Sequence, residues 1–141
     1  MTTRLNKAEY QLLADFRYAL RQFLHFSEAS ARAAGIEPQQ HQALLAIKGF
    51  PERDKITISE LAERLQIKHH SAVGLASRLV ANGFAMREAN PDDRRQVFLA
   101  LTRRGEALLE QLTAVHKEEL RRLGPEIHAM LARLHESGEQ T

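Results

Sequence analysis

Two short runs of polar side chains have the types and spacing to donate hydrogen bonds to phosphates and to base edges. The first run, Lys-His-His-Ser over 68–71, stands where a helix is predicted to begin. Backbone N–H groups at a helix start also attract phosphates, so side chains and backbone would act on the same anion. The second run places Arg94 and Arg95 in a predicted turn, with Arg87 shortly before it. Both runs favour noncovalent binding of a polyanion.

The first run must be positioned by two helices that a tight turn connects. Thr57 with Glu60 three residues later is a capping-box pattern, which predicts a helix over 58–65. A second helix is predicted over about 69–82, with Gly83 as its stop. The inner faces are apolar at helical spacing, through Leu61, Ala62 and Leu65 in the first helix and Ala72, Leu75, Ala76 and Leu79 in the second, with Ile67 filling the turn. This pattern predicts a helix-turn-helix whose second helix begins with an exposed polar run.

The second run is predicted to lie in a β-hairpin. Strands are predicted over 84–88 and 96–101, and the turn between them contains Asn90-Pro91-Asp92-Asp93. In the second strand, Val97, Leu99 and Leu101 alternate and are expected on one face. A further short strand is predicted just before the first helix, near Ile56.

An arginine at a hairpin tip is long enough to enter a DNA minor groove, where the electrostatic potential is most negative. Asp92 and Asp93 oppose a purely electrostatic interpretation, because carboxylates near phosphates weaken binding. We therefore expect Asp93 to orient a neighbouring arginine through a bidentate pair.

The remaining segments are predicted to be helical. A first helix covers about 5–33 and a second covers 38–49, with Gly35 between them. Thr102 can cap a long helix to about 123, and Gly124-Pro125 is expected to break it before a final helix to about 135. The predicted fold is mainly α with a small β-wing, in one domain.

Composition excludes several classes. The 141 residues are 43% hydrophobic and 27% charged, as in globular proteins. No apolar run approaches the ~20 residues of a membrane span, and the first residues lack a signal core, so we expect a cytoplasmic protein without membrane contact. The chain has no cysteine, which excludes disulfides and thiolate zinc sites. The net charge of +2 means that affinity for a polyanion must come from local clusters of charge.

Three segments resemble the MarR family of bacterial transcription regulators: SRLVANGFAMRE over 77–88, PDDRR over 91–95 and LALTRRG over 99–105. The resemblance covers nearly the whole chain. It implies a sequence-specific regulator, a homodimer that binds double-stranded DNA at a pseudo-palindromic operator, usually as a repressor released by a small ligand. The implied DNA-binding residues are Lys68, His69, His70, Ser71, Gly74, Ser77, Arg78, Arg87, Arg94 and Arg95, with Asp93 orienting the wing. Many members have an arginine or polar residue where this chain has Gly74, and serine or threonine in place of Lys68. Base contacts are therefore expected to shift toward 69–71.

The terminal helices predict a dimer on separate grounds. Their apolar faces, which include Leu108, Leu112, Val115, Ile127, Met130, Leu131 and Leu134, exceed what a winged core over 38–101 needs. Left exposed, they would form a large apolar patch, which soluble proteins avoid. We therefore predict dimerisation helices over 1–35 and 103–141. A ligand pocket for a small aromatic or phenolic compound is expected among Phe16, Tyr18, Arg21, His25, His41, Leu45 and His116.

The sequence bears on three alternative functions. Zinc could be held by His41, His116 and Glu119, but no helix carries a His-x-x-x-His pair, so neither a metal nor another cofactor is expected. An enzyme is disfavoured, because Ser71 lacks the elbow and third partner of a nucleophile. A winged-helix module that binds a partner protein without specific DNA binding stays open. Such a module would bind DNA without steep salt dependence.

Overall fold

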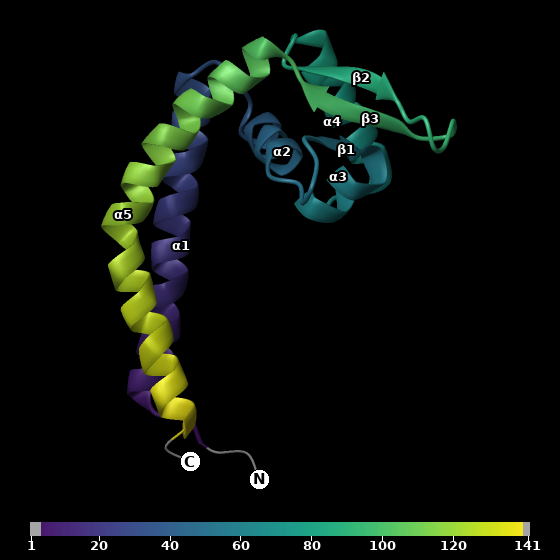
Figure 1. Ribbon diagram of the computed structural model, residues 1–141. Helices are drawn as coiled ribbons and strands as arrows, with labels where there is room; N and C mark the ends of the chain where they lie inside the picture. The colour runs from purple at the N-terminus through teal and green to yellow at the C-terminus, as the bar shows by residue number, and fades with distance from the viewer. Residues whose placement is uncertain (1–3, 140–141) are drawn as a thin grey trace. The chain divides into compact units, whose positions relative to one another are not determined.

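The computed structural model describes residues 4–139, which form five helices and three strands (Figure 1). The elements are α1 (Lys7–Ala33), α2 (Pro38–Lys48), β1 (Lys55–Thr57), α3 (Ile58–Leu65), α4 (His69–Ala81), β2 (Ala85–Ala89), β3 (Val97–Leu101) and α5 (Arg103–Glu139). The chain divides into two compact units. Residues 30–113 form the winged unit, and the described residues up to 29 and from 114 onward form the helix-pair unit. No helix within 4–139 is long and apolar enough to cross a membrane.

The winged unit contains the main hydrophobic core and the sheet. The strands are antiparallel in the order β1-β3-β2, so β3 pairs on both edges. Helices α2, α3 and α4 supply fully buried side chains to the core that the sheet shares, among them Leu44, Leu61 and Leu75. Val97, Leu99 and Leu101 share one face of β3, as predicted, but burial does not alternate with the faces: residues 98–101 are all buried, whereas Val97 is 40% exposed beside the hairpin turn. A central strand covered on both faces reads as a continuous apolar run instead of alternating.

The helix-turn-helix formed where the sequence predicted it. The capping box of α3 is present: the Thr57 hydroxyl accepts the Glu60 N–H at 3.2 Å, and the Glu60 carboxylate accepts the Thr57 N–H at 2.9 Å. Gln66 ends α3 in the left-handed conformation at φ 54°. Ile67 packs against the core in the turn, as expected. Helix α4 then begins at His69.

The Leu-Thr-x-x-Gly stretch anchors the start of α5 to the sheet. The Thr102 hydroxyl donates to the Gly83 carbonyl at 2.6 Å and accepts the Gly105 N–H at 3.1 Å, which confirms its capping role. A Cβ on Gly105 would lie 2.0 Å from the Phe84 carbonyl oxygen. The glycine is therefore required because two backbones meet there.

Two expectations about α5 were wrong. Gly124-Pro125 does not break it, because α5 continues from Arg103 to Glu139 with Pro125 inside. Proline clashes partly with the Cβ of the residue before it, and Gly124 has none. Packing of the fully buried Leu123 further supports this turn. The second error concerns Leu112, assigned above to a dimer surface, which is 2% exposed in the core of the winged unit.

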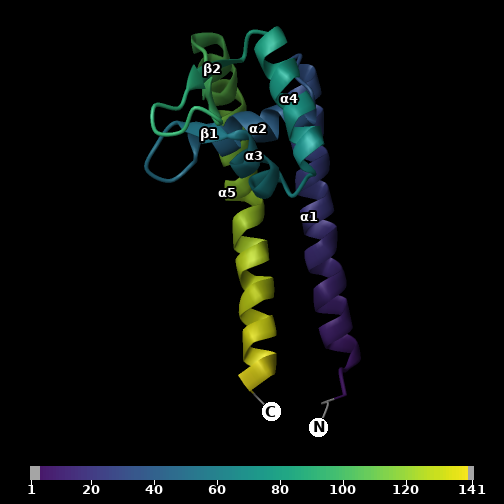
Figure 2. The same ribbon diagram turned by 90° about the vertical axis from the view of Figure 1, so that its right-hand side faces the viewer.

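In the helix-pair unit, α1 and the second half of α5 run in opposite directions, as both views show (Figures 1 and 2). His116 of α5 lies edge-on to the rings of Phe23 and Phe26, and its Nε2 is 2.9 Å from the Ser27 hydroxyl. Many large apolar side chains stay exposed on this unit: Leu5, Tyr10, Leu13, Tyr18, Leu20, Leu24, Val115, Leu120 and Leu131.

Candidate nucleic-acid interface

Helix α4 begins with an open, polar N-terminus. Residues 68–71 are all exposed. Lys68 occupies the N-cap position with extended backbone angles, but its side chain makes no capping hydrogen bond. The first N–H groups of a helix have no partner within it, so these groups face solvent beside two imidazoles and a hydroxyl. This arrangement can bind an oxyanion through backbone and side chains together.

The outward face of α4 is lined mainly by small residues. His70, Gly74, Ser77 and Ala81 are spaced four, three and four residues apart, so they share one side of the helix, opposite the buried Leu75. Only the first of them has a long side chain, so the middle of this face could approach a groove closely. Contacts to base edges are then expected mainly from the N-terminal turn, as in recognition helices generally.

Two arginines are held against this face by partners that sequence spacing did not indicate. Arg78 Nε donates to Glu37 Oε2 at 3.1 Å, and Glu37 is the N-cap residue of α2. Arg87 Nη2 donates to the Ser77 hydroxyl at 3.3 Å, which links β2 to α4. The Arg78 guanidinium also lies over Gly74, where a Cβ would be 3.6 Å from its Nη1. Both contacts limit where these cations can reach.

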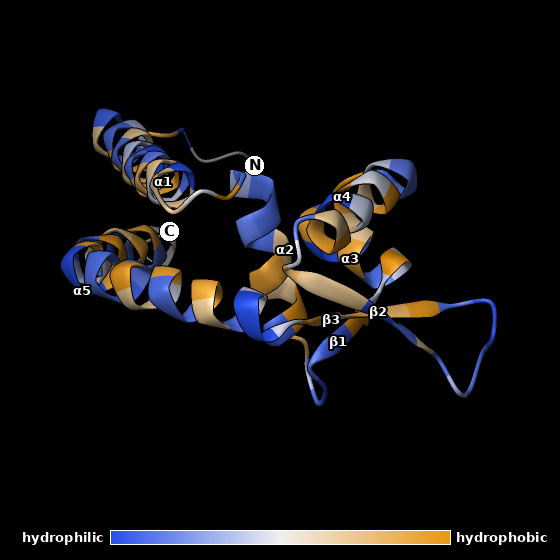
Figure 3. Ribbon diagram, turned by 90° about the horizontal axis from the view of Figure 1, so that it is seen from above, coloured by the Kyte–Doolittle hydropathy of each residue, from blue (hydrophilic) through white to orange (hydrophobic). Residues whose placement is uncertain are grey.

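The wing, defined as β2, β3 and residues 90–96 between them, ends in a hydrophilic turn that extends from the sheet (Figure 3). The Asn90 side chain accepts the Asp92 N–H at 2.9 Å, and the Asp93 carboxylate accepts the Arg95 N–H at 3.0 Å. Among residues 4–139, Asp93 therefore orders the turn through the backbone and not through the arginine pair that we expected.

The cations of this surface differ in how they are neutralised. Arg78 pairs with Glu37, whereas the exposed side chains of Lys68, Arg94 and Arg95 take part in no ion pair within the described chain. Unpaired cations keep their full charge for a phosphate backbone. The predicted set thus separates into free cations at the helix start and wing, and tethered cations along α4.

The residues predicted to bind a ligand are divided between the two units. Tyr18, Arg21 and His25 line one depression of about 530 Å³ in the helix-pair unit, together with Gln22, Phe26, Glu119 and Arg122. Phe16 and His116 are half-buried residues of the same unit. His41, which is 2% exposed, and Leu45, which is 46% exposed, belong to α2 in the winged unit.

The charges at this depression are partly paired. The Arg122 guanidinium donates to the Glu119 carboxylate at 2.6 Å, and this hydrogen bond holds the pKa of Glu119 below its ordinary value. Within the part of the chain described, no three histidine or carboxylate side chains cluster so as to hold a metal ion.

A winged helix-turn-helix with free cations at its recognition helix and wing defines a class of DNA-binding transcriptional regulators. Residues 34–96 match the sequence model of the MarR family. The HTH-type transcriptional repressor MdtR of Bacillus subtilis is 28% identical over 115 residues, which cover 79% of this chain and 72% of MdtR. The repressor YetL of the same organism is 28% identical over 93 residues, covering 65% of this chain and 54% of YetL.

Solved structures agree with these sequence matches. YusO of Bacillus subtilis superposes with a TM-score of 0.62 at 26% identity, covering 92% of this chain and 94% of YusO. AbsC, a MarR family transcriptional regulator from Streptomyces coelicolor, has the same fold at a TM-score of 0.76 and 20% identity, covering 96% and 93% of the two chains. The chain thus matches the MarR family over residues 34–96 and has the fold of solved MarR family structures.

Proposed function

We propose that this protein is a homodimeric repressor that binds a pseudo-palindromic operator and is released from it by a small ligand. The observation that carries the proposal is the pairing of an uncapped, polar α4 start with unpaired wing arginines on one compact unit. Relatives support it: MdtR and YetL are named as repressors, and a MepR variant from S. aureus was solved bound to an oligodeoxyribonucleotide.

Within this proposal the contacts are divided among three groups. Lys68, His69, His70 and Ser71 contact the major groove, with Gly74 allowing close approach. Ser77, Arg78 and Arg87 lie near the DNA backbone, while Arg94 enters the minor groove and Arg95 lies beside it. Asp93 fixes the backbone of the turn that carries both wing arginines.

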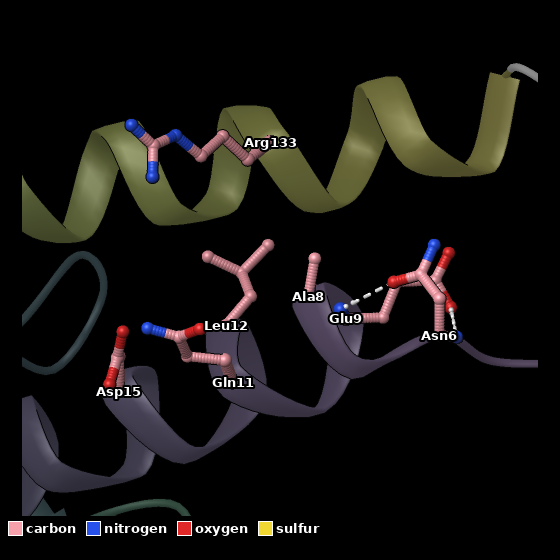
Figure 4. A pocket seen from close by; sticks show the side chains of 7 residues that line it. All are labelled: Asn6, Ala8, Glu9, Gln11, Leu12, Asp15 and Arg133. Carbon is pink, nitrogen blue, oxygen red and sulfur yellow. Dashed lines mark hydrogen bonds between the residues drawn. The ribbon is translucent and has the colours of Figure 1, made fainter.

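The dimer is supported by the apolar surface of the helix-pair unit. Leu24 is 53% exposed and Leu131 is 48% exposed. Near the start of α1 lies a hollow of about 280 Å³, where Arg133 of α5 faces Leu12 and Asp15 (Figure 4). A second copy would cover such surface, and two-fold symmetry would place the recognition helices about 34–36 Å apart, one DNA turn. A monomer at micromolar concentration in analytical ultracentrifugation would refute the dimer.

The proposed ligand is a small aromatic carboxylate or phenol bound at the depression that contains Tyr18, Arg21 and His25. An aromatic wall, a guanidinium and an imidazole suit an aromatic anion. Ligand binding would change the population of the DNA-competent conformation only if the ligand binds one conformation of the protein more tightly than the other. If millimolar aromatic acids leave the melting temperature unchanged, this part of the proposal fails.

Fluorescence anisotropy on the DNA just upstream of the protein's own gene, at two salt concentrations and against a scrambled duplex, tests the central proposal. We expect nanomolar, selective and salt-sensitive binding, which Arg94→Ala weakens at least about tenfold because a minor-groove contact is lost. Equal affinity for the scrambled duplex without salt dependence would instead favour the protein-interaction module.

A further inference from the structure

A small notch lies where α3, α4 and the wing meet within the winged unit. It encloses about 190 Å³ and is lined by the first turn of α3, the first residue of α4 and the base of the wing. Its polar side chains are Thr57, Ser59, His69, Arg95 and Gln96, and no carboxylate lines it. Since a water molecule occupies about 30 Å³ in the liquid, the notch has room for a group several waters in size.

Four of these five polar side chains, all except Thr57, are not used by the fold. Within residues 4–139 none of them makes a side-chain hydrogen bond or an ion pair, although the backbone N–H groups of Arg95 and Gln96 bond to Asp93. Each can donate: a hydroxyl, an imidazole N–H, a guanidinium and an amide. Donors from three separate elements therefore converge on one space.

Glu60, which follows Ser59 in the first turn of α3, is turned to other partners, whereas Glu63 lines a separate hollow next to Ser59 and His69. Glu60 Oε1 accepts the Thr57 N–H, and Glu60 Oε2 accepts from Arg53. The Thr57 hydroxyl is likewise occupied by the Glu60 N–H. The charged side chain that lines the notch itself is thus the Arg95 guanidinium. The uncapped start of α4 adds partial positive charge from its free N–H groups.

We propose that this notch receives one phosphodiester group of the DNA backbone in each half-site and so fixes the wing relative to the helix-turn-helix. The inference rests on the proposed DNA binding and adds Ser59 and Gln96 to the interface. It assigns Arg95 and His69 to phosphate contact, which leaves the groove contacts to Lys68, His70, Ser71 and Arg94. A guanidinium and three further donors without a carboxylate suit a phosphate, whose oxygens only accept, better than a base edge, which presents donors and acceptors.

A DNA phosphate fits this notch better than free phosphate ion. The donors are exposed, so a single small anion would be held weakly at physiological salt. A phosphate that is already delivered by the rest of the interface pays no separate cost of association. The notch then works as a register contact, because it fixes the position of the backbone without carrying sequence information itself.

The test combines protein variants with backbone-neutralised DNA. A set of operator duplexes, each with one methylphosphonate in place of a phosphate, is titrated with the wild type, with Arg95→Ala and with Ser59→Ala/Gln96→Ala. We expect one position per half-site where neutralisation weakens the wild type about tenfold, since a hydrogen bond to a charged group is lost. At that position, neutralising the phosphate should weaken DNA binding by the two variants only slightly, because they already lack the notch contact. At every other position, neutralisation should weaken binding by the variants as much as by the wild type.

Salt dependence and folding provide the controls. Arg95→Ala should reduce the log–log salt slope by about 0.9, whereas the neutral double variant should leave it nearly unchanged. Circular dichroism confirms that each variant is folded. Arg94→Ala, at the tip of the same wing, should keep the full methylphosphonate penalty at the notch position.

Three outcomes would overturn the proposal in distinguishable ways. Identical penalties at every position in all proteins would show that DNA binds without the notch, and the proposed function would survive. A second outcome is that inorganic phosphate competes with DNA more strongly than chloride does at equal ionic strength. If Arg95→Ala abolishes this competition but leaves the methylphosphonate penalties at all positions unchanged, the notch is a site for free anions. Failure of the wild type to bind any duplex would remove the proposed function together with the notch.

Discussion

The two helices of the helix-turn-helix begin in opposite ways. At the start of α3, Thr57 and Glu60 exchange hydrogen bonds between side chain and backbone, and Arg53 pairs with the same carboxylate. At the start of α4, Lys68 has the extended backbone of a capping residue but contributes no side-chain cap. One helix start is closed by its own chain, and the other is left open.

The difference separates stability from binding within one motif. A capping side chain stabilises a helix by about 1 kcal/mol, and α4 lacks this contribution in the free protein. The N–H groups that stay open are the ones that a phosphate can satisfy. A third helix start, that of α5, is closed as well, since the Thr102 hydroxyl accepts the Gly105 N–H. Of these three helices, only α4, which presents the interface residues, begins with a polar turn whose N–H groups have no capping side chain.

The largest effect should come from breaking the closed start of α5. In Gly105→Ala the new Cβ would meet the Phe84 carbonyl oxygen, which is backbone and has no rotamer to change. We expect a loss of about 3 kcal/mol or more of unfolding free energy, measured by urea denaturation. Gly74→Ala is the matched control, because its Cβ makes only an ordinary contact and alanine favours a helix by up to about 1 kcal/mol. Equal midpoints for both variants would contradict the close backbone contact.

The next largest effect should come from opening the start of α3. Thr57→Ala removes the hydroxyl that accepts the Glu60 N–H, so we expect about 1–2 kcal/mol less stability in the same denaturation experiment. DNA affinity measured well below the melting temperature should change little, since the Thr57 hydroxyl lines the notch but is already occupied by the Glu60 N–H. Thr57→Ser, which keeps the hydroxyl, should retain most of the stability. A large loss of DNA affinity in the folded alanine variant would contradict the view that the α3 cap serves stability and not DNA binding.

Local signals in the sequence predicted the fold well, because caps and apolar spacing act over a few residues. The Thr57–Glu60 box and the Gly83 stop placed α3 and α4 within a residue or so of their observed bounds. Pro125 misled the prediction, since its effect depends on the glycine before it and on packing.

The site was predicted less completely than the fold. The pairing of Arg78 with Glu37 joins residues 41 positions apart, so no local pattern could indicate it. The same holds for the notch, whose donors come from three elements distant in sequence. Asp93 was expected to pair with a neighbouring arginine side chain, but its carboxylate accepts the Arg95 backbone N–H, which spacing alone could not specify.

A smaller and opposite effect should follow from closing the start of α4. Lys68→Ser supplies a side-chain acceptor at the N-cap, and Lys68→Ala removes the same charge without supplying one. We expect the serine variant to be more stable than the alanine variant by about 0.5–1 kcal/mol. It should bind operator DNA more weakly than the alanine variant, because its hydroxyl competes with phosphate for the same N–H groups. If the two variants bind equally, the open N–H groups take no part in DNA binding.

The smallest effect should be a pH dependence that belongs to the closed start alone. Burial by itself raises the pKa of Glu60, but the hydrogen bonds from the Thr57 backbone and from Arg53 outweigh it and lower the pKa from its ordinary value of 4.5. A carboxyl group whose pKa is lower in the folded state stabilises the fold above its unfolded pKa. That contribution is lost as the pH falls through the folded value.

Urea unfolding of the wild type and of Glu60→Gln at pH 7 and at about pH 3.5 measures this dependence. The stability advantage of the wild type at pH 7 should shrink at the lower pH, where protonation of Glu60 removes the charge that the glutamine variant also lacks. Lys68→Ala should show no comparable change in its difference from the wild type, because no carboxylate caps α4. A difference between wild type and Glu60→Gln that is the same at both pH values would mean that the α3 cap acts through neutral hydrogen bonds, with no contribution from the carboxylate charge.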